Sequence, residues 1–473
     1  MPPEYDLFAV TRGTITAPAG CGKTQLIADT ISLHKEIKPI LVLTHTNAGV
    51  SSLRIRLQRN GVPNSAYRLA TIDGFAMRLV GRFPVRSGLN PEVLELKTPR
   101  TDYPNIREAA WRLLQAGHLS DALSATYSRL IVDEYQDCSL TQHAIVDWAA
   151  EVLPTCILGD PMQAIFGFRG NVLVDWNTNV LQQFPAIGEL LTPWRWRNAG
   201  TEALGDWLLN CRHTLAAGGS IDLHTAPQEV NWIPLTLRSA DQQRMEAART
   251  RTNTRDGSVL VIGDSMNVQG RHRMASHTPG ATNVESVDLK DLTDFGQSFE
   301  VSAEDSLVRL VTFAGNVMTN VGATELLRRV SSIQRGTARN PPTPTEAAVV
   351  AFANAPSLTS ALNALTAIKE QPNVRAYRPE ILRCCMVAIQ AASDGSCTLH
   401  NATIREREKN RYMSRPIARR SVGSTLLLKG LEAEVAVLLQ PETMDAKHLY
   451  VALTRGSQRV VICSETGILT PTR

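Results

Sequence analysis

Short apolar runs alternate with helical patterns through the first half of the chain. These runs lie at residues 13–17, 40–44, 130–133 and 156–160. The segment after the first run has a helical pattern from Thr24 to about His34. Short buried strands separated by helices are typical of a parallel α/β sheet, in which chemistry gathers at the carboxyl ends of the strands. The first half therefore predicts such a sheet.

The second half repeats this pattern, but a long helical stretch interrupts it. Further apolar runs lie at residues 258–262, 435–439 and 459–462. Residues 280–415 are mainly helical in pattern, and their first part, 285–305, is acidic. The prolines at 340–345 indicate a turn or linker. We expect a second α/β unit split by this insertion, and a smaller helical insertion at 82–128 in the first unit.

Length and composition place the chain among globular proteins. At about 150 residues per domain, 473 residues correspond to roughly three domains, or two with insertions. The apolar share is 43%, the charged share is 20% and the net charge is +4, which excludes a disordered chain. No run is apolar enough to cross a membrane, and residues 1–4 do not resemble a signal peptide. We expect a cytoplasmic protein without a membrane partner.

The loop after the first apolar run has the pattern of a phosphate-binding loop. It reads Ala17-Pro18-Ala19-Gly20-Cys21-Gly22-Lys23-Thr24. A glycine-rich turn between a strand and a helix surrounds phosphates with backbone N–H groups, while a lysine reaches the β- and γ-phosphates and a hydroxyl binds Mg²⁺. Because Ala17 stands where the strict pattern has glycine, an ordinary strand–turn–helix corner is the alternative. The predicted nucleotide-binding residues are Ala17, Gly20, Cys21, Gly22, Lys23 and Thr24, with Thr24 also a metal ligand.

An acidic pair, Asp133 and Glu134, follows the third apolar run. Beside a phosphate-binding loop, Asp133 would hold Mg²⁺, and Glu134 would orient and deprotonate the attacking water. A carboxylate pair at a strand end can also be a solvated strand terminus. The loop upstream favours the first interpretation, so we predict nucleotide hydrolysis.

Several further blocks stand in order along the chain. They read Leu43-Thr44-His45-Thr46-Asn47, Asp133-Glu134-Tyr135-Gln136-Asp137, Gly159-Asp160-Pro161-Met162-Gln163-Ala164-Ile165-Phe166-Gly167-Phe168-Arg169-Gly170, Leu428-Lys429-Gly430-Leu431-Glu432 and Leu449-Tyr450-Val451-Ala452-Leu453-Thr454-Arg455. With the loop at 17–24, these blocks resemble the motifs of the UvrD/Rep-like superfamily 1A helicases. The resemblance implies an α/β protein with two RecA-like parallel-sheet domains, each interrupted by a mainly helical insertion. The implied first domain is 1–81 and 129–193 with insertion 82–128, and the implied second is 194–279 and 416–473 with insertion 280–415.

The resemblance also implies roles at an ATP site. Gln163 resembles the glutamine that senses the γ-phosphate and couples it to DNA. Arg455 resembles the arginine finger, and Arg197 resembles the other arginine on the γ-phosphate. Trp196 takes the place of the aromatic that stacks on the base, and Glu432 that of the carboxylate at the ribose. The implied cofactors are ATP and Mg²⁺. Phosphoryl transfer needs charge neutralisation, and two of the implied cations, Arg197 and Arg455, lie in the second lobe. The site is therefore complete only when the two lobes close.

Other positions resemble the family's contacts to single-stranded DNA. Phe166 and Phe168 resemble an aromatic pair that stacks on bases, although two core phenylalanines on one face of a strand are the alternative. The basic stretch 405–420 either grips a nucleic-acid backbone or forms a solvated helix face. The hydroxyl and amide candidates are Thr46, Asn47, Thr71 and Thr425.

The chain also departs from the family pattern. No glutamine precedes Ala17, so the preference for adenine stays open. Asp73 stands where one DNA-contacting block of the family has a histidine, and Leu426 and Leu427 stand where another has one. The insertion 82–128 is small, and residues 285–305 are acidic where a duplex-binding surface would be basic. We therefore expect little unwinding by the chain alone.

The leading hypothesis is an ATP-dependent single-stranded DNA translocase or helicase with 3′→5′ polarity, which acts on single-stranded or tailed duplex DNA. The alternative is an ATP-gated DNA-binding regulatory subunit that unwinds little and partners a nuclease, as in Gabija-type anti-phage systems. A small-molecule P-loop kinase is disfavoured, because a kinase needs no second lobe carrying Arg455.

Overall fold

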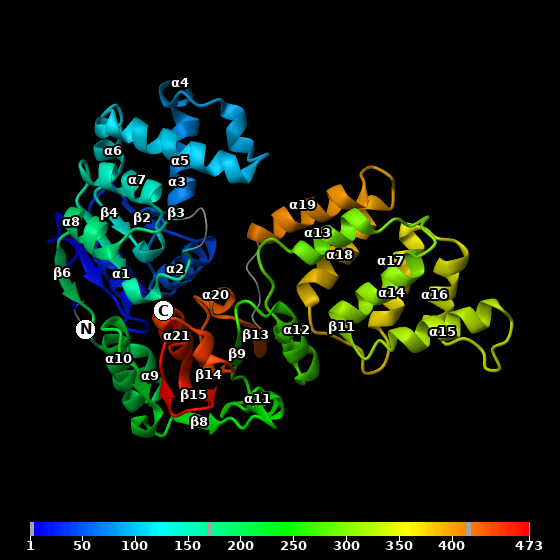
Figure 1. The fold of residues 1–473 in the computed structure, drawn as a ribbon. Coiled ribbons are helices and arrows are strands. Elements are labelled where there is room, and N and C mark those ends of the chain that lie inside the picture. Colours follow the sequence, from blue (N-terminus) through cyan, green and yellow to red (C-terminus); the bar gives the residue numbers. More distant parts are fainter. Residues whose placement is uncertain (1–3, 168–171, 413–417, 473) are drawn as a thin grey trace.

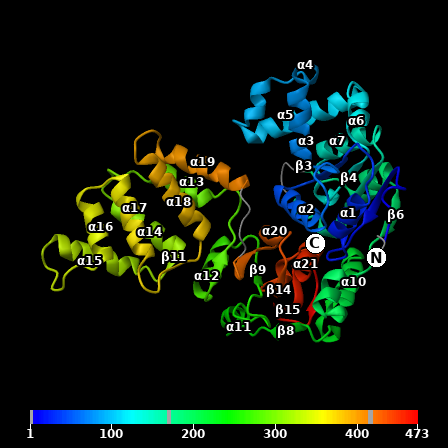
Figure 2. The ribbon, with the colours of Figure 1, turned by 180° about the vertical axis from the view of Figure 1, so that it is seen from behind.

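The computed structural model describes residues 4–167, 172–412 and 418–472. They form two α/β lobes and a body of helices, which stands beside the second lobe when seen from the front and from behind (Figures 1 and 2). Each lobe is built on a six-stranded parallel sheet, so the α/β fold expected from the sequence is confirmed.

The first sheet has its strands in the order β3-β2-β4-β5-β1-β6, with all neighbours parallel. They are β1 (Arg12–Thr16), β2 (Ile40–Thr44), β3 (Tyr67–Thr71), β4 (Leu130–Val132), β5 (Thr155–Gly159) and β6 (Ala186–Glu189). β2, β4 and β5 are buried along their whole length, as expected for strands covered on both faces. The loops after β1, β2, β4 and β5 consequently meet at one edge of the sheet.

Helices cover both faces of this sheet. They are α1 (Lys23–Ser32), α2 (Asn47–Arg59), α3 (Ile72–Arg82), α4 (Pro84–Ser87), α5 (Pro99–Gln115), α6 (Ser120–Thr126), α7 (Leu140–Ala150) and α8 (Leu181–Gln183). Alternate residues of β2 belong to different cores: Ile40 and Val42 share one with residues of α1 and α2, and Leu41 and Leu43 share the other with residues of α3, α5 and α7. Because α5 also packs against α3 and α7, the small insertion is part of the lobe's own core.

The second sheet has the order β10-β13-β9-β14-β15-β8, again with all neighbours parallel. The strands of this lobe are β7 (Ile221–Asp222), β8 (Val230–Pro234), β9 (Val259–Gly263), β10 (Ala281–Asn283), β13 (Arg420–Ser424), β14 (Ala433–Leu438), β15 (Gly456–Ser464) and β16 (Ile468–Leu469). Its helices are α9 (Trp194–Ala199), α10 (Glu202–Ala216), α11 (Ala240–Ala247), α12 (Val268–His277), α20 (Thr425–Leu428) and α21 (Ala446–Leu453).

The helical body has a hydrophobic core of its own, formed by residues between Leu289 and Ala402. It contains α13 (Lys290–Ser298), α14 (Ser306–Val317), β11 (Met318–Thr319), α15 (Ala323–Gln334), α16 (Pro344–Asn354), α17 (Leu358–Lys369), β12 (Arg375–Ala376), α18 (Pro379–Ala392) and α19 (Leu399–Tyr412). The proline cluster ends in a helix start, because Thr343 and Glu346 form a capping box on α16.

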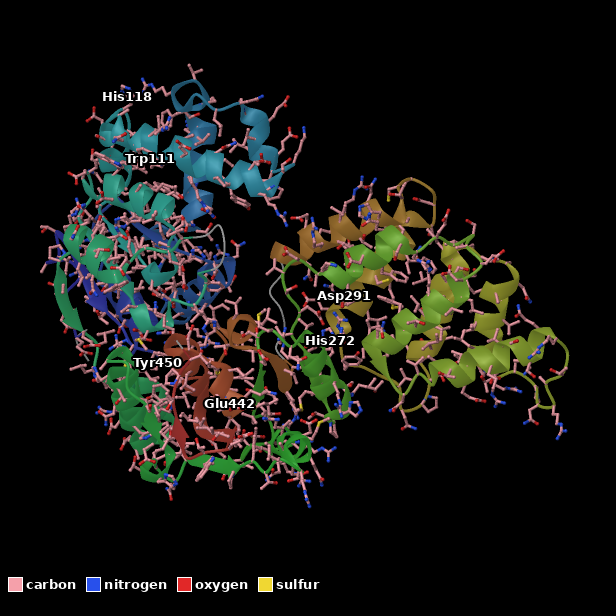
Figure 3. All side chains as sticks on the ribbon, in the orientation of Figure 1. Trp111, His118, His272, Asp291, Glu442 and Tyr450 are labelled. Atoms are coloured by element: carbon pink, nitrogen blue, oxygen red, sulfur yellow. The ribbon has the colours of Figure 1, made fainter. Side chains whose placement is uncertain are left out.

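Two arginines fasten the helical body to the second lobe. Arg375 of β12 donates to backbone carbonyls at and beyond the C-terminal end of α12. Arg378 binds Glu285 through two N–H groups at 2.8 Å and lies 2.7 Å from Asp291 of α13, which Figure 3 labels at this joint. Arg378 and Glu285 are both buried. Since severing a buried, hydrogen-bonded ion pair is costly, the joint is firm.

Candidate active site

The predicted phosphate-binding loop lies between β1 and α1, at the carboxyl edge of the first sheet. Gly20 and Gly22 have φ values of 72° and 88°, in the left-handed region that suits glycine. Among the described residues, no side chain caps the first turn of α1, so its backbone N–H groups can bind an anion. The loop has the backbone form that phosphates require.

Ala17, Cys21 and Thr24 occupy different environments around this loop. Ala17 is buried, and its N–H donates to Gly159 O at 2.8 Å, which anchors the loop to β5. Cys21 is also buried, and burial raises the pKa of its thiol to about 12, so the thiol is unreactive at neutral pH. Thr24 is half-buried in the first turn of α1, at the place expected for a Mg²⁺ ligand.

Lys23 joins the loop to the acidic pair. Its Nζ lies 2.6 Å from Glu134 Oε1 and 3.2 Å from Asp133 Oδ1. Burial alone would lower the pKa of Lys23, but the two carboxylates raise it, so the ammonium stays charged. Burial would likewise raise the pKa of Glu134, but Lys23 and then Lys429 lower it to about 2. An anion-binding loop, a lysine and two carboxylates thus converge. The carboxylates suit Mg²⁺, and the loop and the lysine suit the phosphates of a nucleoside triphosphate.

Glu134 is held by a network that extends to Gln163. Its φ of 56° is unusual for a residue with a side chain and is the kind of strain found at functional sites. Gln136 Nε2 donates to Glu134 Oε2 at 2.5 Å, and Gln136 Oε1 accepts from Asp160 N at 3.0 Å. Asp160 in turn accepts from Gln163 Nε2 at 3.1 Å and from Arg212 Nε at 3.0 Å. The expected γ-phosphate sensor is therefore connected to the expected catalytic base.

The two tryptophans of α9 lie against the phosphate-binding loop. Trp196 is 1% exposed, and its Nε1 donates to Gly456 O at 2.9 Å. A Cβ on Gly20 would come within 2.6 Å of the Trp196 ring. The base-stacking role predicted for Trp196 does not fit this burial. Trp194 is half-buried, and its ring lies so close to Gly22 that a Cβ there would be 2.9 Å from Cδ1, so Trp194 is the better candidate.

The two arginines of α9 lie in different environments. Arg197, predicted at the γ-phosphate, is exposed, and its guanidinium lies 5.8 Å from the Trp194 ring centroid. Arg195 points inward: its Nη1 donates to Thr454 O at 2.6 Å, and its Nη2 pairs with Glu432. Arg195 Nε is buried and has no hydrogen-bond partner within the described part of the chain. Arg195, which the sequence analysis missed, is therefore placed to offer a donor to a ligand.

Helix α21 brings two further groups to the boundary between the lobes. Arg455 lies two positions after its last residue and is 3% exposed, with its guanidinium donating to backbone carbonyls of its own lobe. Burial, with Arg195 nearby, lowers the pKa of Arg455 to about 10, so the side chain remains cationic at neutral pH. Tyr450 Oη accepts from Ala19 N at 3.1 Å, which ties α21 to the phosphate-binding loop (Figure 3).

Three candidates for DNA contact lie at the ends of neighbouring strands in the first lobe. Thr46 and Thr71 cap α2 and α3, and their hydroxyls accept from Gly49 N at 3.0 Å and from Gly74 N at 2.9 Å. Asn47 is exposed in the first turn of α2. The two hydroxyls thus have a structural role as helix caps, and each can still donate its own proton to a phosphate.

The remaining DNA candidates lie at or near the boundary between the lobes. The Phe166 ring lies 5.8 Å from the His45 ring, and Lys429 Nζ lies 4.5 Å from the Phe166 ring centroid. Burial lowers the pKa of His45 to about 4, so its imidazole is neutral at pH 7. Thr425 of the second lobe is 1% exposed, which leaves little of it for a DNA contact. Phe168 lies outside the described residues, as do positions 413–417 of the basic stretch.

Asp73, which stands in place of a family histidine, joins the small insertion to the lobe. Its carboxylate accepts two N–H groups of Arg107 of α5, both at 2.7 Å, and Gln142 Nε2 at 3.0 Å. The side chain at this position is therefore used to anchor α5.

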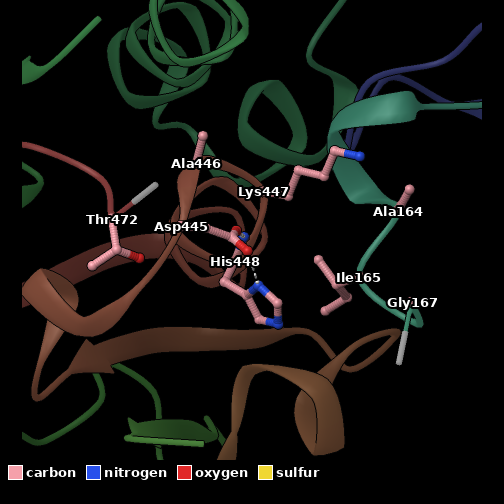
Figure 4. A pocket seen from close by; sticks show the side chains of 8 residues that line it. All are labelled: Ala164, Ile165, Gly167, Asp445, Ala446, Lys447, His448 and Thr472. Carbon is pink, nitrogen blue, oxygen red and sulfur yellow. Dashed lines mark hydrogen bonds and ion pairs between the residues drawn. The ribbon is translucent and has the colours of Figure 1, made fainter. Parts of the chain in front are cut away.

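A cleft of about 400 Å³ opens between the lobes beside Phe166 (Figure 4). Its walls are Ala164, Ile165 and Gly167 of the first lobe and Asp445, Ala446, Lys447, His448 and Thr472 of the second. Asp445 caps α21 by accepting from His448 N at 2.8 Å, and its other oxygen lies 3.0 Å from His448 Nδ1. Because the first wall flanks Phe166, the cleft lies on the side of the DNA candidates.

Comparison with protein families identifies the central part of the first lobe. Residues 97–177 match the UvrD/REP helicase N-terminal domain. The matched segment contains α5, the acidic pair after β4 and Gln163 after β5. The search of curated proteins returns no match to the chain. None of the described helices combines the length and apolarity needed to cross a bilayer.

Proposed function

We propose, since the chain is a UvrD-like superfamily 1A helicase, that it works as an ATP-dependent single-stranded DNA translocase with 3′→5′ polarity. One observation carries the proposal: Lys23, Asp133 and Glu134 of the first lobe converge where Arg195 and Arg455 of the second lobe approach. Catalytic charges divided between two lobes make hydrolysis depend on lobe closure, and repeated closure is how hydrolysis moves a protein along a strand.

The residues at this boundary have separate tasks. The loop with Gly20 and Gly22 surrounds phosphates with backbone N–H groups, and Thr24 and Asp133 provide oxygen ligands for Mg²⁺. When bound, Mg²⁺ and ATP supply the charge-neutralising cation and the phosphoanhydride bond that is cleaved. Glu134, ionised at neutral pH, accepts a proton from the attacking water.

Three cations of the chain complete the site. Lys23, Arg195 and Arg455 neutralise the negative charge that develops on the transferred phosphoryl group. Trp194 provides the surface for the base, and Glu432 orients Arg195. Arg197 is not included in this set, because its side chain is exposed and its guanidinium lies 5.8 Å from the Trp194 ring centroid.

On the DNA side, we propose that Phe166 stacks on a base while Thr46, Asn47 and Thr71 contact phosphates. Stacking tolerates any base, which suits a protein that moves along a strand. The 3′→5′ polarity is supported by the resemblance of the ordered motifs.

Weak unwinding by the chain alone is part of the proposal. Opening a duplex requires surfaces that engage the junction, in addition to the two lobes. Here α5 and α6 contribute to the core of the first lobe, and the stretch 285–305 of the helical body is acidic. An acidic surface repels the phosphate backbone of a duplex.

The test is steady-state ATPase activity with and without single-stranded DNA, followed by strand displacement on 3′-tailed and 5′-tailed duplexes. We expect DNA-stimulated hydrolysis, short and poorly processive displacement on the 3′-tailed substrate only, and no hydrolysis by Lys23→Ala. Absence of stimulation would reject the translocase, and efficient displacement of long duplexes by the chain alone would reject the limited unwinding.

The incorporation of the small insertion into the lobe also favours a second candidate, an ATP-gated regulatory subunit of a nuclease. Such a subunit would bind DNA and hydrolyse ATP without displacing strands, as a component of an anti-phage system of the Gabija type. Stimulated ATPase without displacement on either tailed substrate, together with ATP-dependent control of a co-purifying nuclease, would support this candidate over the first.

A further inference from the structure

Lys429 joins the two lobes through contacts that lie outside the phosphate-binding loop and the acidic pair. It follows α20 in the second lobe, and its side chain is 7% exposed. Its Nζ crosses to the first lobe, where it lies 2.6 and 2.5 Å from the two carboxylate oxygens of Asp137 and 2.6 Å from Gln163 O. The same ammonium lies 4.5 Å from the ring centroid of Phe166. One cation thus touches three groups of the opposite lobe.

These three groups belong to segments that lead to the ATP site on one side and to the DNA candidates on the other. Asp137 ends the short helical turn that begins directly after Glu134, and its N–H donates to Glu134 O at 3.1 Å. Gln163 ends the turn after Asp160, and Phe166 follows three positions later. A shift of the Lys429 ammonium therefore acts on the catalytic base, the γ-phosphate sensor and the stacking ring together.

The contacts also make this cation sensitive to DNA. Asp137 is 2% exposed at its side chain, so the pair is shielded from water, and both charges depend on each other. A cation over an aromatic ring is attracted by the ring's face. A base that stacks on Phe166 fixes the position of this ring, and with it one of the contacts of Lys429.

We propose that Lys429 is a positioning residue through which DNA bound at Phe166 sets the geometry of Glu134 and Gln163 for ATP hydrolysis. This inference rests on the proposed function. In the DNA-bound state, Lys429 holds Asp137 and Gln163 O together, and hydrolysis is fast. Without a stacked base, the Phe166 ring has only its contacts within the chain, and Lys429 contacts Asp137 and Gln163 O for a smaller share of the time.

The experiment measures kcat and KM for ATP with saturating single-stranded DNA and without DNA, in wild type, Lys429→Met, Lys429→Arg and Asp137→Asn. Lys369→Met, which removes an exposed lysine of the helical body, is the matched control. We expect the ratio of the DNA-saturated kcat to the DNA-free kcat to fall about tenfold or more in Lys429→Met and Asp137→Asn, within the usual range of coupling between two sites. Lys429→Arg should restore part of the ratio, and Lys369→Met should keep it.

Other outcomes overturn the inference in distinguishable ways. A Lys429→Met protein in which both kcat values fall by the same factor would show a structural link between the lobes without coupling. An unchanged ratio at saturating DNA, together with a higher DNA concentration needed for half-saturation, would show a simple DNA contact. If wild type itself shows no stimulation by DNA, the proposed function fails, and the coupling role falls with it. Because Asp137→Asn keeps the shape of its side chain, it tests the same contact if Lys429→Met does not fold.

Discussion

The two arginines of α9 provide a matched pair of substitutions that tests the assignment of the γ-phosphate contact. Arg195→Ala removes a guanidinium that binds Thr454 O and Glu432 and has a buried, unpaired Nε within the described chain. Arg197→Ala removes an exposed one. An arginine that neutralises charge mainly in the transition state contributes about 10³ or more to kcat, which is about 4 kcal/mol at roughly 1.4 kcal/mol for each factor of ten.

We therefore expect Arg195→Ala to lower kcat by about 10³ at saturating ATP and DNA. We expect Arg197→Ala to change kcat by only about twofold, as for an ordinary surface substitution. Steady-state ATPase assays give kcat, and titration with a fluorescent ATP analogue gives the nucleotide Kd, which should change little in Arg195→Ala. Thermal unfolding of both variants controls for the loss of the Glu432 pair. A large loss in Arg197→Ala beside a nearly normal Arg195→Ala would refute the reasoning and restore the assignment made from the sequence.

Four further substitutions test other parts of the site. Glu134→Gln should retain ATP binding while stopping turnover, and hydrolysis at the wild-type rate would rule out Glu134 as the base. Arg455→Ala should lower kcat by about 10³ with nearly unchanged ATP affinity, whereas loss of affinity alone in nucleotide titrations would indicate a ground-state contact. Phe166→Ala should weaken single-stranded DNA binding by about 1–3 kcal/mol in fluorescence anisotropy, and unchanged binding would return Phe166 to the core. His45, with its pKa lowered to about 4 from 6.5, resists protonation in the folded state. The free energy of unfolding should therefore fall by up to about 3 kcal/mol as pH drops from 6.5 to 4. His45→Phe should flatten that slope in urea titrations, and an unchanged slope would show that His45 is not responsible.

The apolar pattern predicts strands well where they are buried on both faces. The run at 40–44 coincides with β2, and the run at 156–160 is displaced by one position from β5. It does not predict β3, β10 or β13, because their residues are polar or few and pairing within the sheet decides their conformation. Two of these, β3 and β10, are edge strands, which have one neighbouring strand each and therefore need fewer apolar side chains.

At the site, the sequence predicts residues whose role follows from their immediate neighbours. The loop at 17–24 and the pair Asp133–Glu134 belong to this class, because a strand end fixes their direction. Arg195 and Arg197 cannot be separated in this way, since the orientation of α9 on the phosphate-binding loop decides which one faces the phosphates. The contact between Lys429 and Asp137 joins positions 292 residues apart, and only the packing of the two lobes reveals it.

The firm joint at Arg375 and Arg378 turns the helical body into a lever. Its own core keeps the helices together, and the joint makes them follow the second lobe. When the second lobe rotates by a small angle about the phosphate-binding loop, α15 and α16 therefore move through a larger distance, because they lie far from the loop in both views (Figures 1 and 2). A fluorophore on these helices, paired with one on the first lobe, would read each closing of the lobes as a large displacement. A molecule that binds the helical body at α15 and α16 would therefore resist or drive the closing of the lobes.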